Sequence, residues 1–475
     1  MNPKKVMVIG LDCLTPQLAF DRYLGEMPHL KRLMERGAWG KLRSCDPPIT
    51  VPAWSCMMTS KDPGQLGFYG FRNRKDYSYD ALYFANSLAV KEPTVWNLLS
   101  RRRMDSVLVG VPQTYPPKPL RGHLVTGFLA PDNRSNYTYP EALKQEVEEA
   151  AGGYVIDVKD FRTEDKERLK QQIYEMTEKR FRTVRHLLKS KPWDFFMFVE
   201  MGPDRLYHGF WRYCEPDHRL FEAGNPYEHV LREYHRYLDE RIGELLEDLD
   251  LDSTAVFVVS DHGAKSMHGG ICVNEWLIRE GYLRLKNIPD HPSRLKMDNI
   301  DWAGTRVWGE GGYYSRLFLN VQGREPQGII PQDDYERVRD EIIERLEALG
   351  DEKGNPIGTV VHRPQDLYRV CRNVPPDLIA YFGDLNWRSV GSVGTGCIHT
   401  FKNDTGPDDA NHDRHGVFVY CDPRLPGSQA GRPLQGISLY DIAPSVLDCL
   451  RVPVPSDMLG QSILQKTQRP EHAAP

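Results

Sequence analysis

Three apolar runs, each followed within four residues by an acidic side chain, constrain most strongly what this chain can fold into. The runs and the acids that follow them are Val6–Leu11 with Asp12, Phe195–Glu200 with Asp204, and Ala255–Ser260 with Asp261. Uninterrupted apolar runs of this length are typical of strands buried on both faces of a parallel sheet. The carboxyl ends of parallel strands share one edge of the sheet, and ligands bind there. The pattern predicts a large α/β sheet with one polar site at that edge.

Histidines accompany two of these acids. His208 follows Asp204 by four residues, so the two side chains share a face if the segment is helical, and His262 directly follows Asp261. A third histidine, His412, precedes a further apolar strand. Each feature alone fits a structural role, such as a helix cap or a satisfied core histidine. Together they are better explained by one shared metal centre, because separate caps at each strand end would be a coincidence.

A proline-rich loop leads to Thr50. Pro47 and Pro48 exclude a helix there, and Pro52 suits the first turn of the helix that follows. Thr50 is therefore expected at a loop-to-helix junction, where a hydroxyl and free backbone N–H groups face an anion. One interpretation is that Thr50 only caps the helix. The alternative is that its hydroxyl is a nucleophile.

Composition indicates a globular protein that binds neither nucleic acid nor a membrane. The 475 residues are 40% hydrophobic and 27% charged, with a net charge of −5 and no basic tract. The apolar run near Met1 is too short for a signal peptide or a membrane span. Nine scattered cysteines without a CxxC pair suggest reduced thiols. We therefore expect a cytoplasmic protein without nucleic-acid or membrane partners.

The strand and helix pattern predicts two core segments separated by an insertion. Buried strands alternate with amphipathic helices over residues 1–282, the first part of the core. The pattern loosens over 283–374, which we interpret as an inserted cap or subdomain. A strand over Asp377–Phe382 is expected to resume the core, whose second part spans 375–465. The tail 466–475 is polar and is expected to be disordered.

The chemistry of the candidate ligands indicates metal ions bound through oxygen and nitrogen. Carboxylates and imidazoles suit zinc or manganese, and a set without thiolates argues against a structural zinc. Two metals with about three protein ligands each need about six residues. The candidates supply that number: Asp12, Asp204, His208, Asp261, His262 and His412. Thr50 adds a hydroxyl, which is a poor nucleophile at neutral pH unless a metal lowers its pKa.

In the order and spacing of its motifs, the chain resembles the alkaline phosphatase superfamily, and within it the type I phosphodiesterase/nucleotide pyrophosphatase family. The resemblance spans nearly all of residues 5–460. The motifs that carry it are Val8-Ile9-Gly10-Leu11-Asp12, Pro48-Ile49-Thr50-Val51-Pro52, Gly202-Pro203-Asp204 with His208, Ser260-Asp261-His262-Gly263, and His412 before Gly416. Further similar stretches are Tyr115-Pro116-Pro117, Pro376-Asp377-Leu378 and Tyr440-Asp441-Ile442-Ala443-Pro444.

The resemblance implies a three-layer α/β sandwich around a large, mixed but mainly parallel central sheet. It also implies two divalent ions, with zinc as the first expectation and manganese as the alternative. Each ion would have three protein ligands: Asp204, His208 and His412 for one, and Asp12, Asp261 and His262 for the other. Thr50 would bridge the two ions. The implied reaction is hydrolysis of a small phosphoester, as by a phosphodiesterase or nucleotide pyrophosphatase, through a phospho-threonine intermediate.

The chain departs from the family at two positions near the expected substrate. Leu66 stands where many relatives have histidine, and Phe71 where the nucleotide pyrophosphatases have a phosphate-binding asparagine. Both differences weaken the case for a nucleotide substrate and leave the metal chemistry unaffected. We expect Phe71, Arg72 and Asn73 to bind the far end of the substrate at the rim of the site.

Other interpretations remain at this point. A phosphomonoesterase or phosphomutase of the same superfamily is one alternative, and a non-catalytic nucleotide-binding α/β protein is another, although the latter predicts an incomplete ligand set. Among the histidines, spacing favours His412 over His415 as the ligand and leaves His415 to orient a ligand through a hydrogen bond. We interpret His268 as a surface residue and His235 as a residue on a helix face.

Overall fold

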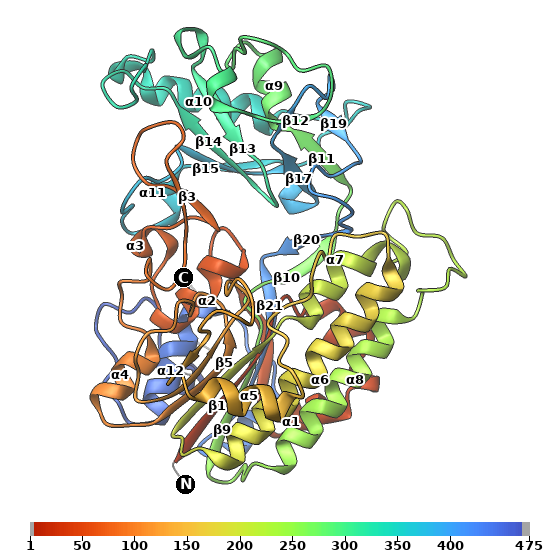
Figure 1. Ribbon diagram of the computed structural model, residues 1–475, viewed down its shortest axis with the longest axis vertical. Coiled ribbons are helices and arrows are strands. Elements are labelled where there is room, and N and C mark those ends of the chain that lie inside the picture. The colour runs from red at the N-terminus through yellow and green to blue at the C-terminus, as the bar shows by residue number, and fades with distance from the viewer. Residues whose placement is uncertain (1–3, 468–475) are drawn as a thin grey trace.

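A nine-stranded sheet forms the core of the molecule, which a computed structural model describes over residues 4–467 (Figure 1). The strand order is β22-β2-β21-β9-β1-β8-β5-β6-β7, and β21 and β7 run antiparallel to the strands beside them. The bounds are β22 Ile437–Ser438, β2 Ala38–Arg43, β21 His415–Cys421, β9 Thr254–Val259, β1 Lys5–Leu11, β8 Phe195–Glu200, β5 Ser106–Val111, β6 Gly122–Thr126 and β7 Thr138–Tyr139. The predicted large, mainly parallel sheet is confirmed.

Helices cover both faces of this sheet and make a three-layer sandwich. One face carries α2 Thr50–Thr59, α4 Val95–Arg101 and α12 Ile442–Cys449. The other carries α1 Pro28–Arg36, α5 Leu143–Ala151, α6 Lys166–Ser190, α7 Gly202–Cys214 and α8 Val230–Glu247. Because both faces are covered, the central strands β8 and β9 are buried along their whole length, which explains their unbroken apolar runs.

The register of the central strands delivers two acids to the same place. β1 pairs in parallel with β9, with Gly10 opposite Val259. Asp12 and Asp261 each stand two residues beyond this pair, at the carboxyl edge of the sheet. Gly10 is needed beside them, because a Cβ at this position would lie 2.7 Å from the ring of Trp54. The expected polar edge therefore follows from strand register alone.

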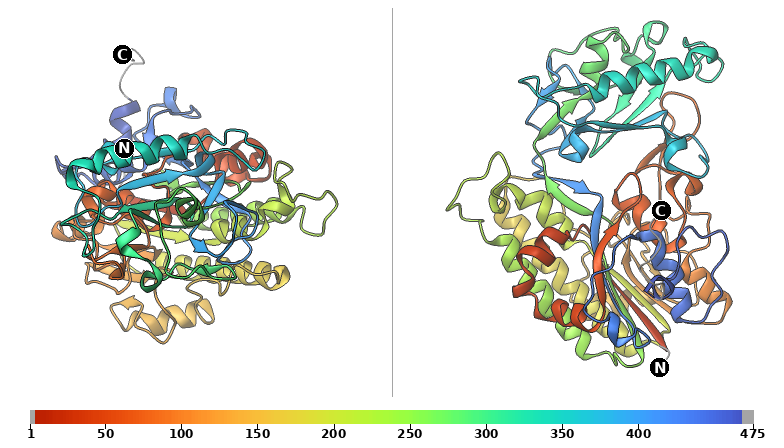
Figure 2. Two further views of the ribbon diagram at one scale, coloured as in Figure 1. Left: turned by 90° about the horizontal axis from the view of Figure 1, so that it is seen from above. Right: turned by 180° about the vertical axis from the view of Figure 1, so that it is seen from behind.

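A smaller lobe stands beyond this edge and has its own hydrophobic core (Figure 2). Its larger sheet has the order β13-β14-β16-β15, with β13 Val307–Glu310, β14 Ser315–Leu319, β16 Leu378–Tyr381 and β15 Val360–His362. Further elements are β11 Gly269–Cys272, α9 Val273–Arg279, β12 Ser293–Arg294, α10 Tyr335–Glu347, α11 Pro364–Leu367, β17 Trp387–Val390, β18 Ser392–Val393 and β19 His399–Thr400. Two strands, β10 Gly263–Ser266 and β20 Ala410–Asp413, pair with each other where the chain enters and leaves the lobe.

The smaller lobe takes in residues from both sides of the expected insertion. Its core includes Ile271 before that segment and Val393 after it. The strand expected over Asp377–Phe382 to resume the main sheet is β16, which pairs instead with β14 and β15. A short buried strand has the same apolar signature in either sheet, so the sequence pattern does not distinguish the two destinations.

The ends of several elements also differ from expectation. The segment Thr15–Arg36 is mostly helical, as expected, but is divided into a π-helix at Gln17–Arg22, a 3-10 helix at Leu24–Glu26 and α1, which begins at Pro28. Residues 466 and 467 end helix α13, Ile463–Thr467, whereas the rest of the predicted disordered tail lies outside the described residues. Within residues 4–467, no helix combines the length and apolar character needed to cross a bilayer.

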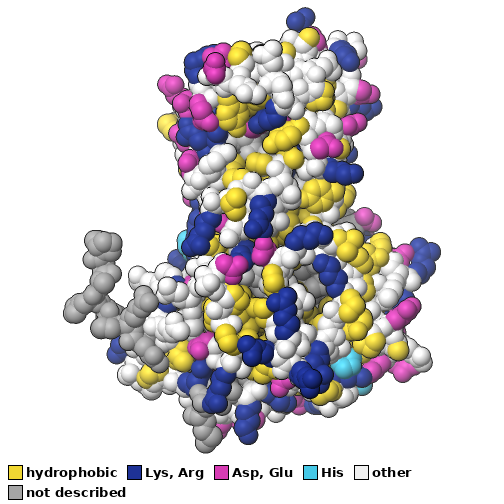
Figure 3. All heavy atoms as spheres, turned by 90° about the vertical axis from the view of Figure 1, so that its left-hand side faces the viewer, with side chains coloured by type: hydrophobic (Ala, Val, Ile, Leu, Met, Phe, Trp, Pro, Cys, Tyr) yellow, Lys and Arg dark blue, Asp and Glu magenta, His cyan; other side chains and the backbone are white. Residues whose placement is uncertain are grey.

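A hairpin of the core lobe reaches into the smaller lobe. The hairpin consists of β3 Arg72–Arg74 and β4 Leu82–Phe84, and helix α3 Pro63–Leu66 precedes it in the chain. Tyr79 at its tip stacks on Trp302 with ring centroids 3.5 Å apart, and buried Arg74 pairs with buried Glu325 at 3.2 Å. Lysine and arginine side chains gather along the surface where the two lobes meet (Figure 3).

We expect Arg74→Ala to destabilise the protein by about 2–3 kcal/mol, because it leaves part of the buried Glu325 charge unpaired. This loss of unfolding free energy is smaller than the ~3–5 kcal/mol expected when a buried charge loses every partner, because Arg324 also contacts Glu325. Urea unfolding followed by tryptophan fluorescence measures it. Lys75→Ala, at an exposed neighbouring position, is the matched control and should change stability by less than ~0.5 kcal/mol.

Candidate metal centre

Thr50 is the first residue of α2 and does not cap it. The cap position is Ile49, which has extended backbone geometry and no side chain that accepts a hydrogen bond. The first N–H groups of a helix have no partner within the helix, so they remain available to an anion here. The buried Thr50 hydroxyl lies 3.2 Å from Nε2 of His262. The structure thus gives Thr50 a position that capping does not explain.

Asp12, Asp261 and His262 form one cluster at the ends of β1 and β9. His262 Nε2 lies 3.2 Å from Oδ2 of Asp261 and 3.9 Å from Oδ1 of Asp12. One oxygen of each carboxylate is bonded, to the Trp54 indole N–H at 2.7 Å and to the Cys13 amide at 3.2 Å. The other oxygen of each, Asp12 Oδ1 and Asp261 Oδ2, has no hydrogen-bond partner although it is buried.

The electrostatics of this cluster favour a bound cation. Burial raises the pKa of Asp12 well above its usual range, and the nearby charge of Asp261 raises it further. Burial likewise raises the pKa of Asp261. Two buried carboxylates with open oxygens are stable as anions only when a positive charge lies between them. A divalent ion bound to the open oxygens supplies that charge.

Asp204, His208 and His412 form a second cluster beside the first. Helix α7 places Asp204 and His208 one turn apart, and His412 lies on β20. The Nε2 atom of His208 is 3.3 Å from Oδ1 of Asp204 and 3.3 Å from Nε2 of His412, while His412 Nε2 is 3.9 Å from the same oxygen. Arg205 binds the other Asp204 oxygen at 2.5 Å.

All three histidines present the same nitrogen to the centre. The Nδ1 atoms of His262 and His412 lie 3.1 Å and 2.9 Å from the carbonyl oxygens of Gly263 and Pro48, so they carry the proton. Burial lowers the pKa of His262 to about 4 and that of His412 well below its usual range, which keeps both rings neutral. Each Nε2 therefore carries a lone pair that faces the centre, where it contacts the Thr50 hydroxyl in His262 and Nε2 of His208 in His412. This is the arrangement of histidines that bind metal through Nε2.

His208 differs from the other two histidines in its partner. Its Nδ1 lies 2.7 Å from the Asp408 carboxylate. Burial opposes a charge on His208, but Asp408 and Asp204 more than offset it and raise its pKa to about 9. The imidazolium is then the local cation between Asp204 and Asp408, and a divalent ion bound at Nε2 in place of the proton would supply that positive charge instead.

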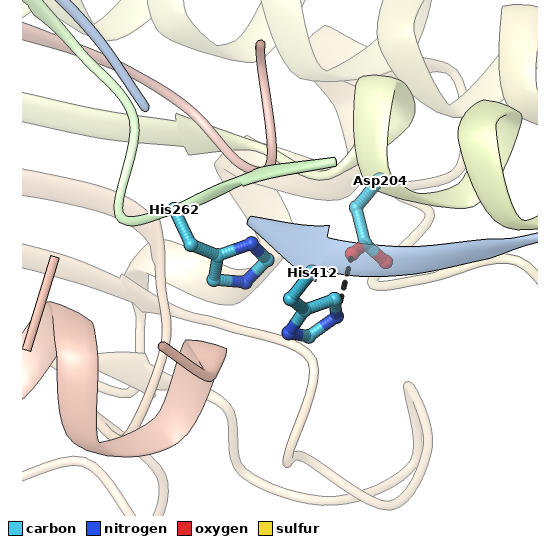
Figure 4. A group of neighbouring side chains, drawn as sticks. All are labelled: Asp204, His262 and His412. Carbon is cyan, nitrogen blue, oxygen red and sulfur yellow. Dashed lines mark ion pairs between the residues drawn. The ribbon is translucent and has the colours of Figure 1, made fainter. Parts of the chain in front are cut away.

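His262 belongs to both groups of candidate ligands, and Figure 4 shows its ring beside that of His412, which in turn faces Asp204. Its ring stacks on that of His412 with centroids 3.8 Å apart, and its ligand atom lies within 4.8 Å of those of Asp204 and His412 as well as those of Asp12 and Asp261. The seven residues expected at the metal site therefore come together in one buried centre: Asp12, Thr50, Asp204, His208, Asp261, His262 and His412. Carboxylate and imidazole donors with open lone pairs fit zinc or manganese.

The three residues expected to bind substrate lie in the β3–β4 hairpin region instead of among the ligands. Both polar atoms of Asn73 bond to that loop, accepting from the Tyr69 amide at 2.7 Å and donating to the Gly70 carbonyl at 2.8 Å. Phe71 packs edge-on against Phe128. Arg72 is partly exposed, and its carbonyl accepts a hydrogen bond from Arg316. The amide of Asn73 thus shapes the turn, and substrate contact by these residues stays a prediction.

The remaining histidines occupy different surroundings. His415 is partly exposed at the start of β21, whereas His412 is buried among the ligands. His268 is exposed, as expected. His235 lies on the inward face of α8, where its ring bonds to the Leu231 carbonyl and the Tyr207 hydroxyl.

Sequence reasoning missed the residues that support the ligands. Asp408 contacts His208, Tyr313 packs against His208 and His412, and Trp54 contacts Asp12. Asp408 is one of 66 acidic residues, and nothing in its local sequence distinguishes it. Only its position four residues before His412 gives a weak signal.

The fold and the centre together define an α/β protein with clustered carboxylate and imidazole side chains beside a helix-terminal hydroxyl. The model of the type I phosphodiesterase/nucleotide pyrophosphatase family matches residues 6–416, and the chain belongs to this family. Membership of this family supports hydrolase activity of the phosphodiesterase or nucleotide pyrophosphatase type. No curated protein matches the chain.

Solved structures show the same fold at low sequence identity. Human ectonucleotide pyrophosphatase/phosphodiesterase 5 is 13% identical with a TM-score of 0.56, and 98% of each chain is covered. An inactive variant of the murine protein in complex with AMP is 12% identical with a TM-score of 0.57, covering 98% of this chain and 99% of that one. Phosphonoacetate hydrolase from Sinorhizobium meliloti 1021, in complex with phosphonoformate, is 15% identical with a TM-score of 0.59, covering 95% and 96%.

We expect Asp12→Asn to raise the melting temperature of the metal-free protein, because it removes one of two buried anions that lack a counter-charge. The same variant should lose most of the stabilisation that zinc gives the wild type, about 2.7 kcal/mol at a hundredfold excess over Kd. Thermal melts with chelator and with added zinc measure both effects.

Asp239→Asn is the control for this test. Asp239 is also a buried carboxylate, but both of its oxygens accept backbone amides, those of His29 and Leu30, where α1 packs against α8. This variant should keep the full zinc-dependent shift. A metal-free Asp12→Asn protein that melts below the wild type would contradict the expected repulsion.

Proposed function

We propose that the protein hydrolyses phosphodiesters with two divalent metal ions, zinc in the first instance, and with Thr50 as the nucleophile. One observation carries the proposal: carboxylate and imidazole side chains from four separate segments of the chain, two of them with an unpartnered buried oxygen, converge beside the Thr50 hydroxyl at the start of α2. Family membership supports the hydrolase activity. The metals and the covalent intermediate are our inference.

The ligand set divides between two ions. Asp204, His208 and His412 would hold one, and Asp12, Asp261 and His262 the other. Bound at these positions, two divalent ions lower the pKa of a hydroxyl and neutralise charge on phosphoryl oxygens. Each ligand is oriented from outside the centre, so the protein's own contribution is to fix these groups before substrate arrives.

The proposed reaction has two displacements. Oγ1 of Thr50 forms a bond to phosphorus while the bond to the leaving alcohol breaks, which leaves a phospho-threonine. Water then attacks the same phosphorus, and the bond to Oγ1 breaks to release the phosphomonoester and restore Thr50. The open N–H groups at the start of α2 are placed to bind the non-bridging oxygens in both steps.

The surrounding charges support a diester over a monoester. A monoester carries one more charge at phosphorus and needs a further cation aimed at it. The arginines beside the ligands are engaged elsewhere: Arg205 binds Asp204 and Asp157, and Arg162 binds Asp408 and the Tyr313 hydroxyl. A phosphomonoesterase or phosphomutase is the second candidate.

We expect Thr50→Ala to reduce hydrolysis of bis-p-nitrophenyl phosphate by ~10³-fold or more while metal content and melting temperature stay near wild type. Thr50→Ser is the matched control, because it restores a hydroxyl at the same position and should recover much of the activity. Steady-state kinetics and elemental analysis on all three proteins are the measurements. Full activity in Thr50→Ala would exclude Thr50 as the nucleophile.

We expect kcat/KM for bis-p-nitrophenyl phosphate to exceed that for p-nitrophenyl phosphate by at least about tenfold, since the two arginines beside the ligands, Arg162 and Arg205, are bound to carboxylates and not available for the extra monoester charge. Both substrates release the same chromophore, so one assay with zinc and one with manganese compare them directly. A preference for the monoester would identify the enzyme as a phosphatase and direct attention to Arg72.

A further inference from the structure

We propose that Asp408 positions His208 as a metal ligand and that Arg162 and Tyr313 hold Asp408 in place. The inference rests on the proposed function and extends it to three residues outside the ligand set. Asp408 and Tyr313 lie on the smaller-lobe side of the ribbon formed by β10 and β20, whereas Arg162 belongs to the core lobe. One ligand is thereby oriented by residues from both lobes.

The carboxylate of Asp408 uses both oxygens. Oδ1 lies 2.7 Å from Nδ1 of His208. Oδ2 accepts from Nε of Arg162 at 2.9 Å and from the Tyr313 hydroxyl at 3.1 Å. The side chain is completely buried, and its ion pairs with Arg162 and His208 leave neither oxygen without a partner. Asp408 is therefore a fixed anion directed at one ring nitrogen.

This contact sets His208 apart from the other two histidines. The Nδ1 atoms of His262 and His412 face neutral carbonyl groups of Gly263 and Pro48. A carboxylate partner fixes the ring in the same way but also makes the opposite nitrogen more basic, which strengthens its bond to a metal. His208 is accordingly the ligand whose affinity depends most on a charged neighbour.

Tyr313 connects this pair to the smaller lobe. It lies just before β14, and its ring stacks on His208 with centroids 5.0 Å apart and packs at a tilt against His412 with centroids 4.1 Å apart. Its hydroxyl accepts from Arg162 at 2.5 Å and donates to Asp408. Its carbonyl accepts from Asn411, the residue before His412, at 3.0 Å. Tyr313 thus restricts the two imidazoles and their supporting carboxylate together.

A purely structural role for Asp408 predicts something different. In that case the carboxylate would serve to neutralise Arg162 and Arg388, the latter 3.8 Å away, and its loss would lower stability without changing metal binding. A positioning role predicts weaker metal binding at one site even when the protein stays folded. Metal affinity therefore separates the two explanations.

The test is a zinc competition titration of the full-length protein against a chromophoric chelator, with the number of bound ions counted by elemental analysis. Asp408→Asn keeps the shape of the side chain and removes its charge. We expect it to weaken one of the two zinc sites by ~10–100-fold and to leave the other unchanged. Asp409→Asn is the matched control, because that neighbouring buried carboxylate faces Arg212 instead of His208 and should leave both sites unchanged.

Tyr313→Phe provides a second variant that keeps the stacked ring and removes only the hydroxyl. We expect it to weaken the same site by less than ~10-fold. A folded Asp408→Asn protein that binds both ions with wild-type affinity overturns the inference, as does an equal loss in Asp409→Asn. If Asp408→Asn does not fold, an unchanged titration of Tyr313→Phe overturns it. A wild-type protein that binds fewer than two ions overturns the proposed function and this inference with it.

Discussion

Two carboxylates buried side by side without a counter-charge are the constraint on which the rest of the centre depends. The parallel register of β1 and β9 brings Asp12 and Asp261 to the same point, where each keeps one unbonded oxygen. Leaving that much negative charge uncompensated in the interior would be costly. Among residues 4–467, no hydrogen-bond donor meets either open oxygen. The indole of Trp54 and the amide of Cys13 orient the carboxylates and leave the open oxygens directed inward.

The sheet edge and its ligands could be predicted because they depend on local signals. An apolar run followed by an acid indicates both that a buried strand is present and where it ends. His208 and His262 could be predicted for the same reason, since His262 directly follows such an acid and His208 lies four residues after one. Thr50 could be placed at a helix start because prolines constrain the backbone around it.

The supporting residues could not be predicted, because their contacts are distant in sequence. Asp408 meets His208 across a separation of 200 residues, and Tyr313 meets it across 105. A single sequence carries no record of such pairs. Asn73 shows a second limit: an amide in a loop beside the site suggests a substrate contact, yet its polar atoms bond to its own turn. The sequence could not show which sheet β16 joins, because a short buried strand has the same apolar pattern in either sheet.

The order of strands in the large sheet has a consequence for how the chain is made. β2 is synthesised early, but its neighbours β21 and β22 come from the last sixty or so residues of the chain. β21 also lies between β2 and β9 in the sheet. During synthesis, β2 therefore remains an unpaired edge while the entire smaller lobe emerges and closes around its own core. An open strand edge of that kind promotes association with other chains. The nascent protein thus passes through a long interval in which its metal ligands exist in part but the ribbon that carries His412 does not, so the centre is completed among the last events of folding.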